Sequence, residues 1–200
     1  MGGEYGVEAM NPHLVYVVGP SGAGKDSLLN WLRARLSTES PLRWARRTIN
    51  RPATTEGENH ESVSSEAFGI LLETQQLAMH WSANTHQYGI RHSELLPLPQ
   101  PSWIFVNGSR GYLNAAAASH PGMTVLHITA ERQVLQQRLL GRGRESLEAI
   151  EQRLNRTPPL NVPAGCHFIE FLNHDPLEVS GPKLLKALTS LPGWPVACDL

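Results

Sequence analysis

Short apolar runs alternate with segments of helical periodicity along most of this chain. Runs rich in β-branched and aromatic residues predict strands, and apolar positions three or four apart predict amphipathic helices. The expected strands cover residues 14–18, 103–106, 124–128 and 167–172. The expected helices cover residues 26–36, 109–119, 131–140, 146–156 and 177–191. This alternation predicts an α/β fold, with a mainly parallel sheet and helices on both faces.

Residues 43–98 break the alternation, because they are polar and carry one helical pattern, at 65–77, before a run from 80 to 91 without a clear period. Insertions on a rigid scaffold commonly carry binding groups, so this region is expected to form a substrate-binding subdomain. Pro97, Pro99 and Pro101 are expected to close it and return the chain to the core.

Composition narrows the class of protein. The chain has 200 residues, of which 40% are hydrophobic, and this is enough for one domain with a substantial core. A formal net charge of −1 predicts neither a nucleic-acid nor a membrane partner. Cys166 and Cys198 have no disulfide-framework or metal-ligand spacing, which favours a reducing, cytoplasmic location. No apolar run is long enough to span a bilayer. Residues 1–10 lack the features of a signal peptide and are expected to form a flexible leader.

The most informative motif follows the first expected strand and opens the first expected helix. It is a phosphate-binding loop, in which glycines allow backbone N–H groups to surround a phosphate and the helix N-terminus attracts the same anion. Lys25 is expected to reach the outer phosphates. The expected nucleotide-binding residues are Gly19, Pro20, Ser21, Gly22, Ala23, Gly24, Lys25, Asp26 and Ser27.

One position departs from the usual motif. A Ser or Thr that ligates magnesium normally follows the lysine, and this chain has Asp26 there. We interpret Asp26 as a Mg²⁺ ligand, direct or through water. The alternative is that Asp26 only complements the positive end of the helix, which is worth about 0.3–1 kcal/mol. Ser27 is a weaker alternative ligand, since the next helical residue points about 100° away.

Four motifs together resemble the guanylate-kinase-like P-loop kinases. They are Gly-Pro-Ser-Gly-Ala-Gly-Lys at 19–25, Arg-Thr-x-x-Arg-Pro at 47–52 with Gly57-Glu58, His80-Trp81 followed by Tyr88-Gly89, and Arg-Leu-Leu-Gly-Arg-Gly at 138–143 followed by Arg153-Leu154. The resemblance implies a single kinase domain over residues 11–200. Its core would cover 11–42 and 96–200, its substrate-binding subdomain about 43–95 and its lid about 138–156.

The resemblance also assigns roles. Arg51 and Tyr88 occupy the positions that hold the acceptor's phosphate in this family. The lid arginines that grip the phosphates of ATP during transfer correspond to Arg138, Arg142 and Arg153. Asn173 begins a turn that lies near the adenine in the family. Gly141 and Gly143 interrupt the helical pattern here, as a mobile lid requires, although a solvated basic helix face is the alternative.

Several departures argue against a guanine-reading pocket. His80 replaces the glutamate that reads guanine, Arg47 replaces a serine that assists base recognition, and Thr54 replaces a second phosphate-holding arginine. Asn107, followed by Gly108-Ser109-Arg110, replaces an aspartate. A histidine and an arginine cannot accept from the N–H groups of guanine as a carboxylate does. Losing such a partner costs large discrimination.

These departures resemble the ribose 1,5-bisphosphate phosphokinase branch, which is associated with phosphonate breakdown. The branch also carries Gly-Lys-Asp-Ser and Asn-Gly-Ser-Arg at these places. The implied reaction transfers the γ-phosphoryl group of ATP, with Mg²⁺, to the 1-phosphate of ribose 1,5-bisphosphate and gives 5-phosphoribosyl 1-diphosphate (PRPP). A phosphate acceptor is already largely dianionic, so alignment and charge neutralisation suffice without a general base. The expected substrate-binding residues are Arg47, Arg51, His80, Tyr88, Asn107 and Arg110.

Other interpretations stay open at this point. Arg47 is either a substrate contact or part of a solvated pair with Arg46. The usual metal site has a hydroxyl after the lysine and an acidic group at the end of the strand. This chain has the acidic Asp26 at the first place and the neutral Asn107 at the second, which keeps the number of carboxylates constant. A nucleoside monophosphate kinase shares the fold and the mechanism. A non-catalytic, peptide-binding module of the same fold is the third alternative, but it typically lacks the lysine found here as Lys25. The histidines show no zinc-ligand spacing.

Overall fold

A computed structural model describes residues 13–36, 40–51, 60–83, 85–96, 102–143, 146–155 and 160–195. These ranges leave out the expected leader, the closing prolines, Thr54, Gly57-Glu58, Arg144, Arg156 and Cys198. Within the described part of the chain, no helix combines the length and the apolar character needed to cross a membrane.

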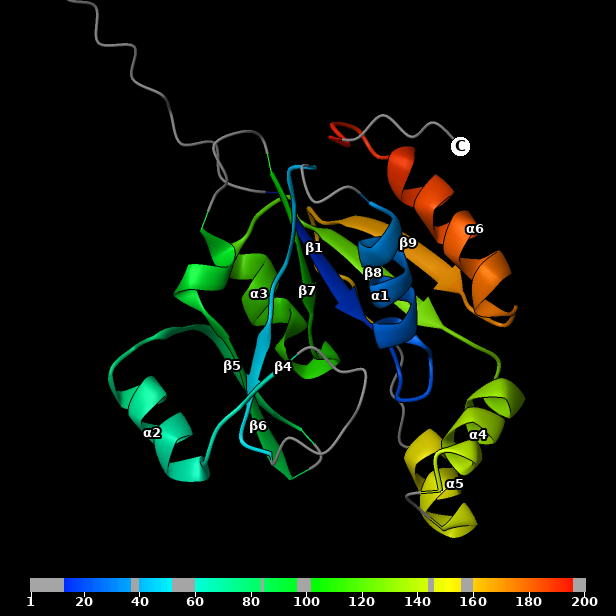
Figure 1. Ribbon diagram of the computed structural model, residues 1–200, viewed down its shortest axis with the longest axis horizontal. Helices are drawn as coiled ribbons and strands as arrows, with labels where there is room; N and C mark the ends of the chain where they lie inside the picture. The colour runs from blue at the N-terminus through cyan, green and yellow to red at the C-terminus, as the bar shows by residue number, and fades with distance from the viewer. Residues whose placement is uncertain are drawn as a thin grey trace, which may run out of the picture.

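A five-stranded parallel sheet forms the centre of the molecule (Figure 1). Its order is β2-β7-β1-β8-β9, from β2 (Leu42–Trp44), β7 (Trp103–Asn107), β1 (His13–Val18), β8 (Thr124–Thr129) and β9 (His167–Leu172). Tyr16 of the central β1 lies in register with Val106 on one side and Val125 on the other. The predicted α/β fold with a parallel sheet is therefore confirmed, and β2 is a strand that the sequence pattern did not indicate.

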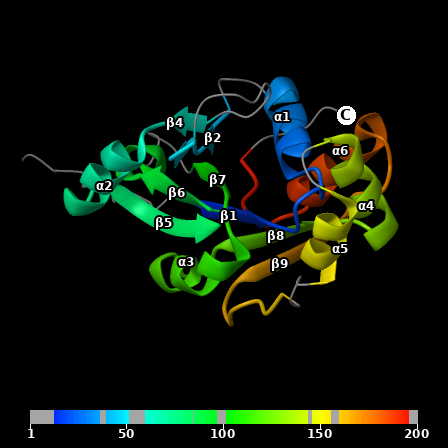
Figure 2. The same cartoon turned by 90° about the horizontal axis from the view of Figure 1, so that it is seen from below.

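Helices cover both faces of this sheet (Figures 1 and 2). On one face, α1 (Lys25–Arg35) and α6 (Leu177–Thr189) pack on the sheet through Leu28, Trp31 and Leu184. The pair α4 (Arg132–Gly141) and α5 (Leu147–Asn155) extends the same apolar core. On the other face lie η2 (Arg110–Tyr112) and α3 (Leu113–Ser119). Odd positions of β1 therefore enter one core and even positions the other, as alternation along a strand requires.

A second sheet of four short strands lies beside the first, in the order β4-β3-β6-β5. It consists of β3 (Arg47–Ile49), β4 (His60–Ser62), β5 (Leu77–Ala83) and β6 (His86–Arg91), with α2 (Ser65–Glu73) packed on it. The helix predicted over 65–77 ends earlier, because the chain turns at Thr74 and Gln75, and Gln75 takes a positive φ of 52°. The run without a clear period at 80–91 belongs mostly to the antiparallel pair β5–β6.

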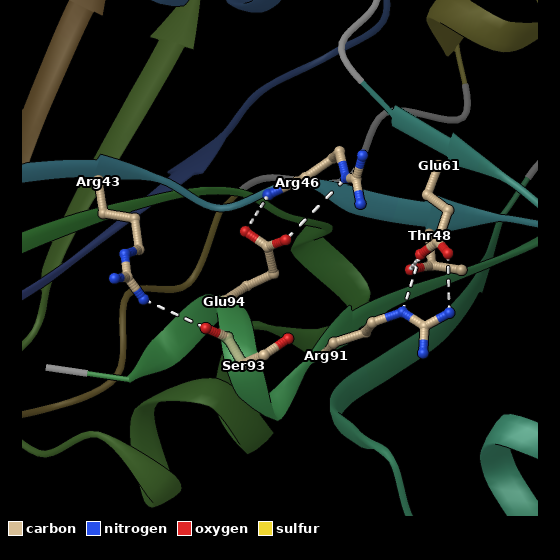
Figure 3. Close-up of polar contacts among 7 residues, drawn as sticks. All are labelled: Arg43, Arg46, Thr48, Glu61, Arg91, Ser93 and Glu94. Atoms are coloured by element: carbon tan, nitrogen blue, oxygen red, sulfur yellow. Dashed lines mark hydrogen bonds and ion pairs between the residues drawn. The ribbon is translucent and has the colours of Figure 1, made fainter. Parts of the chain in front are cut away.

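Polar contacts fasten this second sheet (Figure 3). The Glu61 carboxylate accepts from Arg91 Nε and Nη2, each at 2.8 Å, and from Thr48 Oγ1 at 2.8 Å, so that one side chain of β4 holds β3 and β6. Glu94 of η1 (His92–Leu95) accepts from the backbone N–H of Arg46 at 3.0 Å. The bond from Arg46 to Glu94 ties the segment between β2 and β3 to the segment that follows β6.

Candidate active site

A cavity of about 850 Å³ opens beyond the carboxyl end of β1. Its walls come from the phosphate loop, the four-stranded sheet, the turn after β7 and the helices α4 and α5. Figure 2 shows the four-stranded sheet and α4–α5 on opposite sides of the chain that leaves β1. Ligands of parallel α/β sheets bind at this edge. The described residues lining the cavity include one carboxylate, Asp26, and six basic side chains: Lys25, Arg47, Arg51, Arg110, Arg142 and Arg153.

Lys25 is the first residue of α1 and lies at the bottom of this cavity. Its Nζ donates to the carbonyl oxygens of Gly19 at 2.9 Å and Pro20 at 3.0 Å. Burial lowers the pKa of Lys25 to about 8, and Asp26 partly opposes this shift. Nearby arginines, with Arg47 the strongest of them, lower it further. The loop thus holds a cation that an incoming anion stabilises.

The backbone of the phosphate loop is held from behind by Asn173 and Arg138. Asn173 Nδ2 donates to the carbonyl of Ala23 at 2.8 Å, and Arg138 Nη1 donates to the carbonyl of Asn173 at 2.9 Å. Gly24 has φ 83°, and a β-carbon on it would lie 2.5 Å from Asn173 Nδ2. A glycine is therefore required here for both reasons.

The structure also shows where the other predicted nucleotide-binding and lid residues lie. Arg138 and Asn173 do not line the cavity but support the loop, and burial is the main cause that lowers the pKa of Arg138. Ala23 is fully buried and contributes its carbonyl to the same support. Ser27 is exposed on α1 and also lies outside the cavity wall. The remaining loop residues that were predicted, from Gly19 to Gly22 and from Gly24 to Asp26, do line it.

Asp26 accepts two hydrogen bonds on one carboxylate oxygen. Arg47 Nη2 lies 3.1 Å from Asp26 Oδ1, and Asn107 Nδ2 lies 2.7 Å from the same atom. Asp26 Oδ2 accepts no hydrogen bond from the described residues, and the side chain is 43% exposed in the cavity. One carboxylate together with phosphate oxygens is a donor set that suits Mg²⁺. The residues present therefore fit a divalent metal bound between Asp26 and a nucleotide, and the described residues hold no group of three or more His, Cys, Asp or Glu side chains that would form a site alone.

The opposite wall comes from β5 and β6. Tyr88 of β6 lines this wall, and Arg51, which follows β3, also lines the cavity. The Tyr88 ring stacks on Trp81 with centroids 5.8 Å apart and an interplanar angle of 2°. The structure does not bring His80 into the cavity: His80 is exposed, and neighbouring side chains on a strand point to opposite faces, so Trp81 faces the cavity instead. The cross-strand pair Trp81–Tyr88 explains why both rings share this wall.

The turn after β7 completes the cavity with Asn107 and Arg110. Gly108 follows β7, and a β-carbon on it would lie 2.1 Å from the Tyr16 ring. The Tyr16 hydroxyl accepts from the Ser109 N–H at 3.0 Å and fixes this turn. Burial lowers the pKa of Arg110.

Arg142 lies at the end of α4, where it is exposed, and Arg153 lies on α5. The cavity is also lined by Trp81, Ala83, His86 and Gln152, which the sequence motifs did not assign to the site. Trp81 alternates with Ala83 on β5, and His86 alternates with Tyr88 on β6, so each pair faces the same side of the hairpin. This alternation can be recognised only when the hairpin is known.

A crystal structure of guanylate kinase from Anaplasma phagocytophilum matches 90% of this chain and 86% of its own chain, with a TM-score of 0.56 and 12% sequence identity. This likeness shows that the chain has the fold of the guanylate-kinase-like P-loop kinases. No family model matches the chain.

Curated relatives define the family more narrowly. Ribose 1,5-bisphosphate phosphokinase PhnN of Psychromonas ingrahamii is 40% identical over 175 residues, which cover 88% of this chain and 89% of the relative. The protein of the same name from Thiobacillus denitrificans is 37% identical over 177 residues, 88% and 92% of the two chains. The chain therefore belongs to the ribose 1,5-bisphosphate phosphokinase family, as its resemblance predicted. Membership in a kinase family implies ATP, a small-molecule substrate and, typically, a divalent metal ion.

Proposed function

We propose that the protein transfers the γ-phosphoryl group of ATP to the 1-phosphate of ribose 1,5-bisphosphate and releases PRPP and ADP. The single observation that carries the proposal is the charge of the cavity wall, on which six basic side chains surround one carboxylate. Phosphoryl transfer between two polyanions requires that their mutual repulsion be neutralised and that the reacting oxygens be aligned. A cavity with this charge suits two phosphorylated substrates better than a substrate recognised through a purine ring.

The reaction needs no general base from the protein, because a phosphate monoester is largely dianionic near neutral pH and its oxygen attacks directly. Lys25 neutralises charge on the outer phosphates of ATP, and Arg142 and Arg153 approach the transferred group from α4 and α5. The bond from the acceptor's oxygen to the γ-phosphorus forms as the bond to the bridging oxygen of ADP breaks. Guanidinium groups suit this work because they donate paired N–H bonds to phosphate oxygens.

Arg51, Tyr88 and Arg110 are proposed to hold the phosphates of the acceptor. Arg51 and Tyr88 line one wall and Arg110 comes from the turn after β7, so that they reach the cavity from two sides. The stacked rings of Trp81 and Tyr88 leave a flat surface beside the sugar. The segment from 138 to 156 is proposed to act as the lid of the core domain at 11–42 and 96–200, and residues 43–95 as the substrate-binding subdomain.

The proposed metal is Mg²⁺, with Asp26 Oδ2 as its protein ligand. Asp26 would hold such a cation beside the phosphates of ATP, and the cation would supply positive charge that offsets the charge developing during transfer. The chain's own contribution is to keep Asp26 Oδ2 facing the cavity, since both hydrogen bonds to that carboxylate fall on Oδ1.

Guanine recognition fits the site poorly. Apart from Asp26, which lies in the nucleotide-binding loop, no carboxylate is found among the described residues of the cavity wall. A wall without a second acidic group cannot accept from the N–H groups of guanine as a glutamate does.

The test is a comparison of acceptors. The protein is incubated with Mg-ATP and either ribose 1,5-bisphosphate or GMP, and PRPP and GDP are followed by mass spectrometry, with Lys25→Met as the inactive control. PRPP formed by the parent protein and not by the control supports the proposal. GDP formed faster than PRPP contradicts it and assigns a nucleoside monophosphate kinase.

A further inference from the structure

The ion pair between Arg47 and Asp26 connects the two halves of the cavity. Asp26 belongs to the first turn of α1 and so to the nucleotide side, whereas Arg47 begins β3 in the four-stranded sheet. Arg47 Nη2 lies 3.1 Å from Asp26 Oδ1. The Arg47 side chain is only 15% exposed, and its exposed part lines the cavity. An arginine from the four-stranded sheet is thus held by a carboxylate of α1, the helix that follows the phosphate loop.

Asp26 does not depend on Arg47 for its position. Asn107, at the end of β7, is 7% exposed and donates to the same Oδ1 at 2.7 Å. Asp26 lies on α1, which packs on the central sheet, and Asn107 ends β7 of that sheet, so this bond does not involve the four-stranded sheet. If the charge of Asp26 were compensated by a cation, Asn107 would still hold the carboxylate.

The pairing has an electrostatic consequence for an anion on the acceptor side. A carboxylate 3.1 Å from a guanidinium offsets the positive charge with which that guanidinium attracts a phosphate. If Asp26 Oδ2 held a divalent cation, the cation would offset the carboxylate instead, and the attraction of Arg47 for a phosphate would be restored. Pairing with Arg47 and binding of the cation therefore compete for the negative charge of Asp26, although Arg47 and the nucleotide lie on different sides of the cavity.

We propose that Asp26 couples the two substrates: while it pairs with Arg47 it weakens acceptor binding, and when it holds the metal of the bound nucleotide it makes the charge of Arg47 available to the acceptor's phosphate. The identity of the acceptor rests on the proposed function, whereas the exchange of partners at Asp26 does not. The result is positive cooperativity between Mg-nucleotide and acceptor, so that the protein binds the acceptor tightly only when the phosphoryl donor is present.

The first experiment measures the dissociation constant of ribose 1,5-bisphosphate with and without Mg²⁺ and a non-hydrolysable ATP analogue. We expect the nucleotide to tighten acceptor binding about 10-fold in the parent protein, within the usual range of coupling between sites. In Asp26→Asn, acceptor binding without nucleotide should be several-fold tighter than in the parent, and the nucleotide should no longer improve it. Loss of a metal ligand alone would not tighten binding in the absence of nucleotide.

A double-mutant cycle shows whether Arg47 carries the effect. In an Arg47→Met background, Asp26→Asn should change acceptor affinity by less than about 2-fold, because the carboxylate then has no partner to offset. Arg33→Met, which removes an exposed arginine of α1 away from the cavity, is the matched control and should keep the coupling of the parent. Equal coupling in the parent and in Asp26→Asn overturns the proposal, and so does an unchanged effect of Asp26→Asn in the Arg47→Met background.

A second experiment needs no acceptor. The guanidinium N–H signals of Arg47, assigned by their loss in Arg47→Lys, report its pairing by NMR. We expect slow exchange and restricted rotation in the free protein, and faster exchange after addition of Mg²⁺ with the ATP analogue. Signals that do not respond overturn the proposal. If ribose 1,5-bisphosphate binds to none of the proteins while these signals do respond, the proposed acceptor is wrong and the exchange at Asp26 stands.

Discussion

In the five-stranded sheet, each residue from Leu14 to Val18 is buried and packs on one of two apolar cores. In the four-stranded sheet, β3 and β4 have three residues each, and the Glu61 carboxylate joins three of its strands through Arg91 and Thr48. Apolar cores cover both faces of the first sheet, whereas the second also depends on charged groups that are about a quarter exposed. We therefore expect the four-stranded sheet to open more easily than the five-stranded one.

The largest expected effect tests this difference with one substitution in each sheet. Phe105 and Phe68 are both 1% exposed, but Phe105 belongs to the large core beside Trp44 and Trp194, whereas Phe68 packs in a small cluster with Leu71 and Leu77. Phe105→Ala should lower the free energy of unfolding of the whole domain by about 3–5 kcal/mol, measured by urea denaturation. Phe68→Ala should act locally and raise amide hydrogen exchange mainly over residues 60–91. Equal losses of global stability, with no local difference in exchange, would show that the two sheets unfold as one unit.

A slightly smaller effect is expected at the loop that the central sheet supports. Lys25→Met removes the cation at the bottom of the cavity and should lower kcat by about 10²- to 10³-fold, as loss of one transition-state donor does. Because burial disfavours the charged form of Lys25, the variant should melt at the temperature of the parent or above it. Steady-state kinetics and a thermal melt check the two parts. A variant with parental kcat contradicts the assignment of Lys25.

Glu61 tests the polar fastening of the second sheet. Glu61→Gln should lower stability by about 1 kcal/mol at neutral pH, a modest value because the pair is partly exposed. Hydrogen bonds from Arg91 are the largest cause that lowers the pKa of Glu61 below its ordinary 4.5. The stabilisation is therefore fully present above pH 4.5 and is lost as the pH falls through the lower pKa of the folded protein. Denaturation from pH 7 to pH 3 measures the difference in stability between the parent and Glu61→Gln, and this difference should shrink as the pH falls. The control Glu73→Gln, at the exposed end of α2, should differ little from the parent at any pH.

The smallest effect concerns protons that accompany nucleotide binding. The pKa of Lys25 lies at about 8 in the free protein, and phosphates bound beside it raise this pKa. At pH 9 the free lysine is mostly neutral, so nucleotide binding should take up most of one proton, whereas at pH 6 it should take up almost none from this group. Titration calorimetry in buffers of different ionisation enthalpy measures the uptake. The same uptake in Lys25→Met would assign it to another group.

The sequence was sufficient for the central sheet because its signals are local. Its long strands are mainly apolar, although His127 interrupts β8 and Glu170 interrupts β9. The predicted bounds of β9 and the predicted start of α6 match the structure to the residue. The phosphate loop was equally readable, since Gly24 and its neighbours take conformations that other residues disfavour.

The second sheet was less readable from sequence. Its short strands mix polar and apolar residues, and the β5–β6 hairpin turns at Thr85 with a positive φ of 66°, where no glycine marks the turn. The resemblance predicted His80 as a substrate-binding residue, and in the structure its neighbour Trp81 lines the cavity. The same limitation hid β2, whose three residues become a strand only because β7 pairs with them.

The amino-acid order by itself determined the α/β fold, the phosphate-binding loop and the membership of a kinase family, because strand burial and loop conformation depend on residues close in sequence. Only the tertiary structure decided how the charged groups are shared. Asp26, Arg47 and Asn107 lie up to 81 positions apart, and their contacts follow from the way the two sheets meet. Arg138 and Asn173 likewise hold the loop, because Arg138 lies on α4 and Asn173 follows β9, behind the loop. Long-range polar contacts of this kind depend on the packing of the whole chain, and no local pattern encodes them.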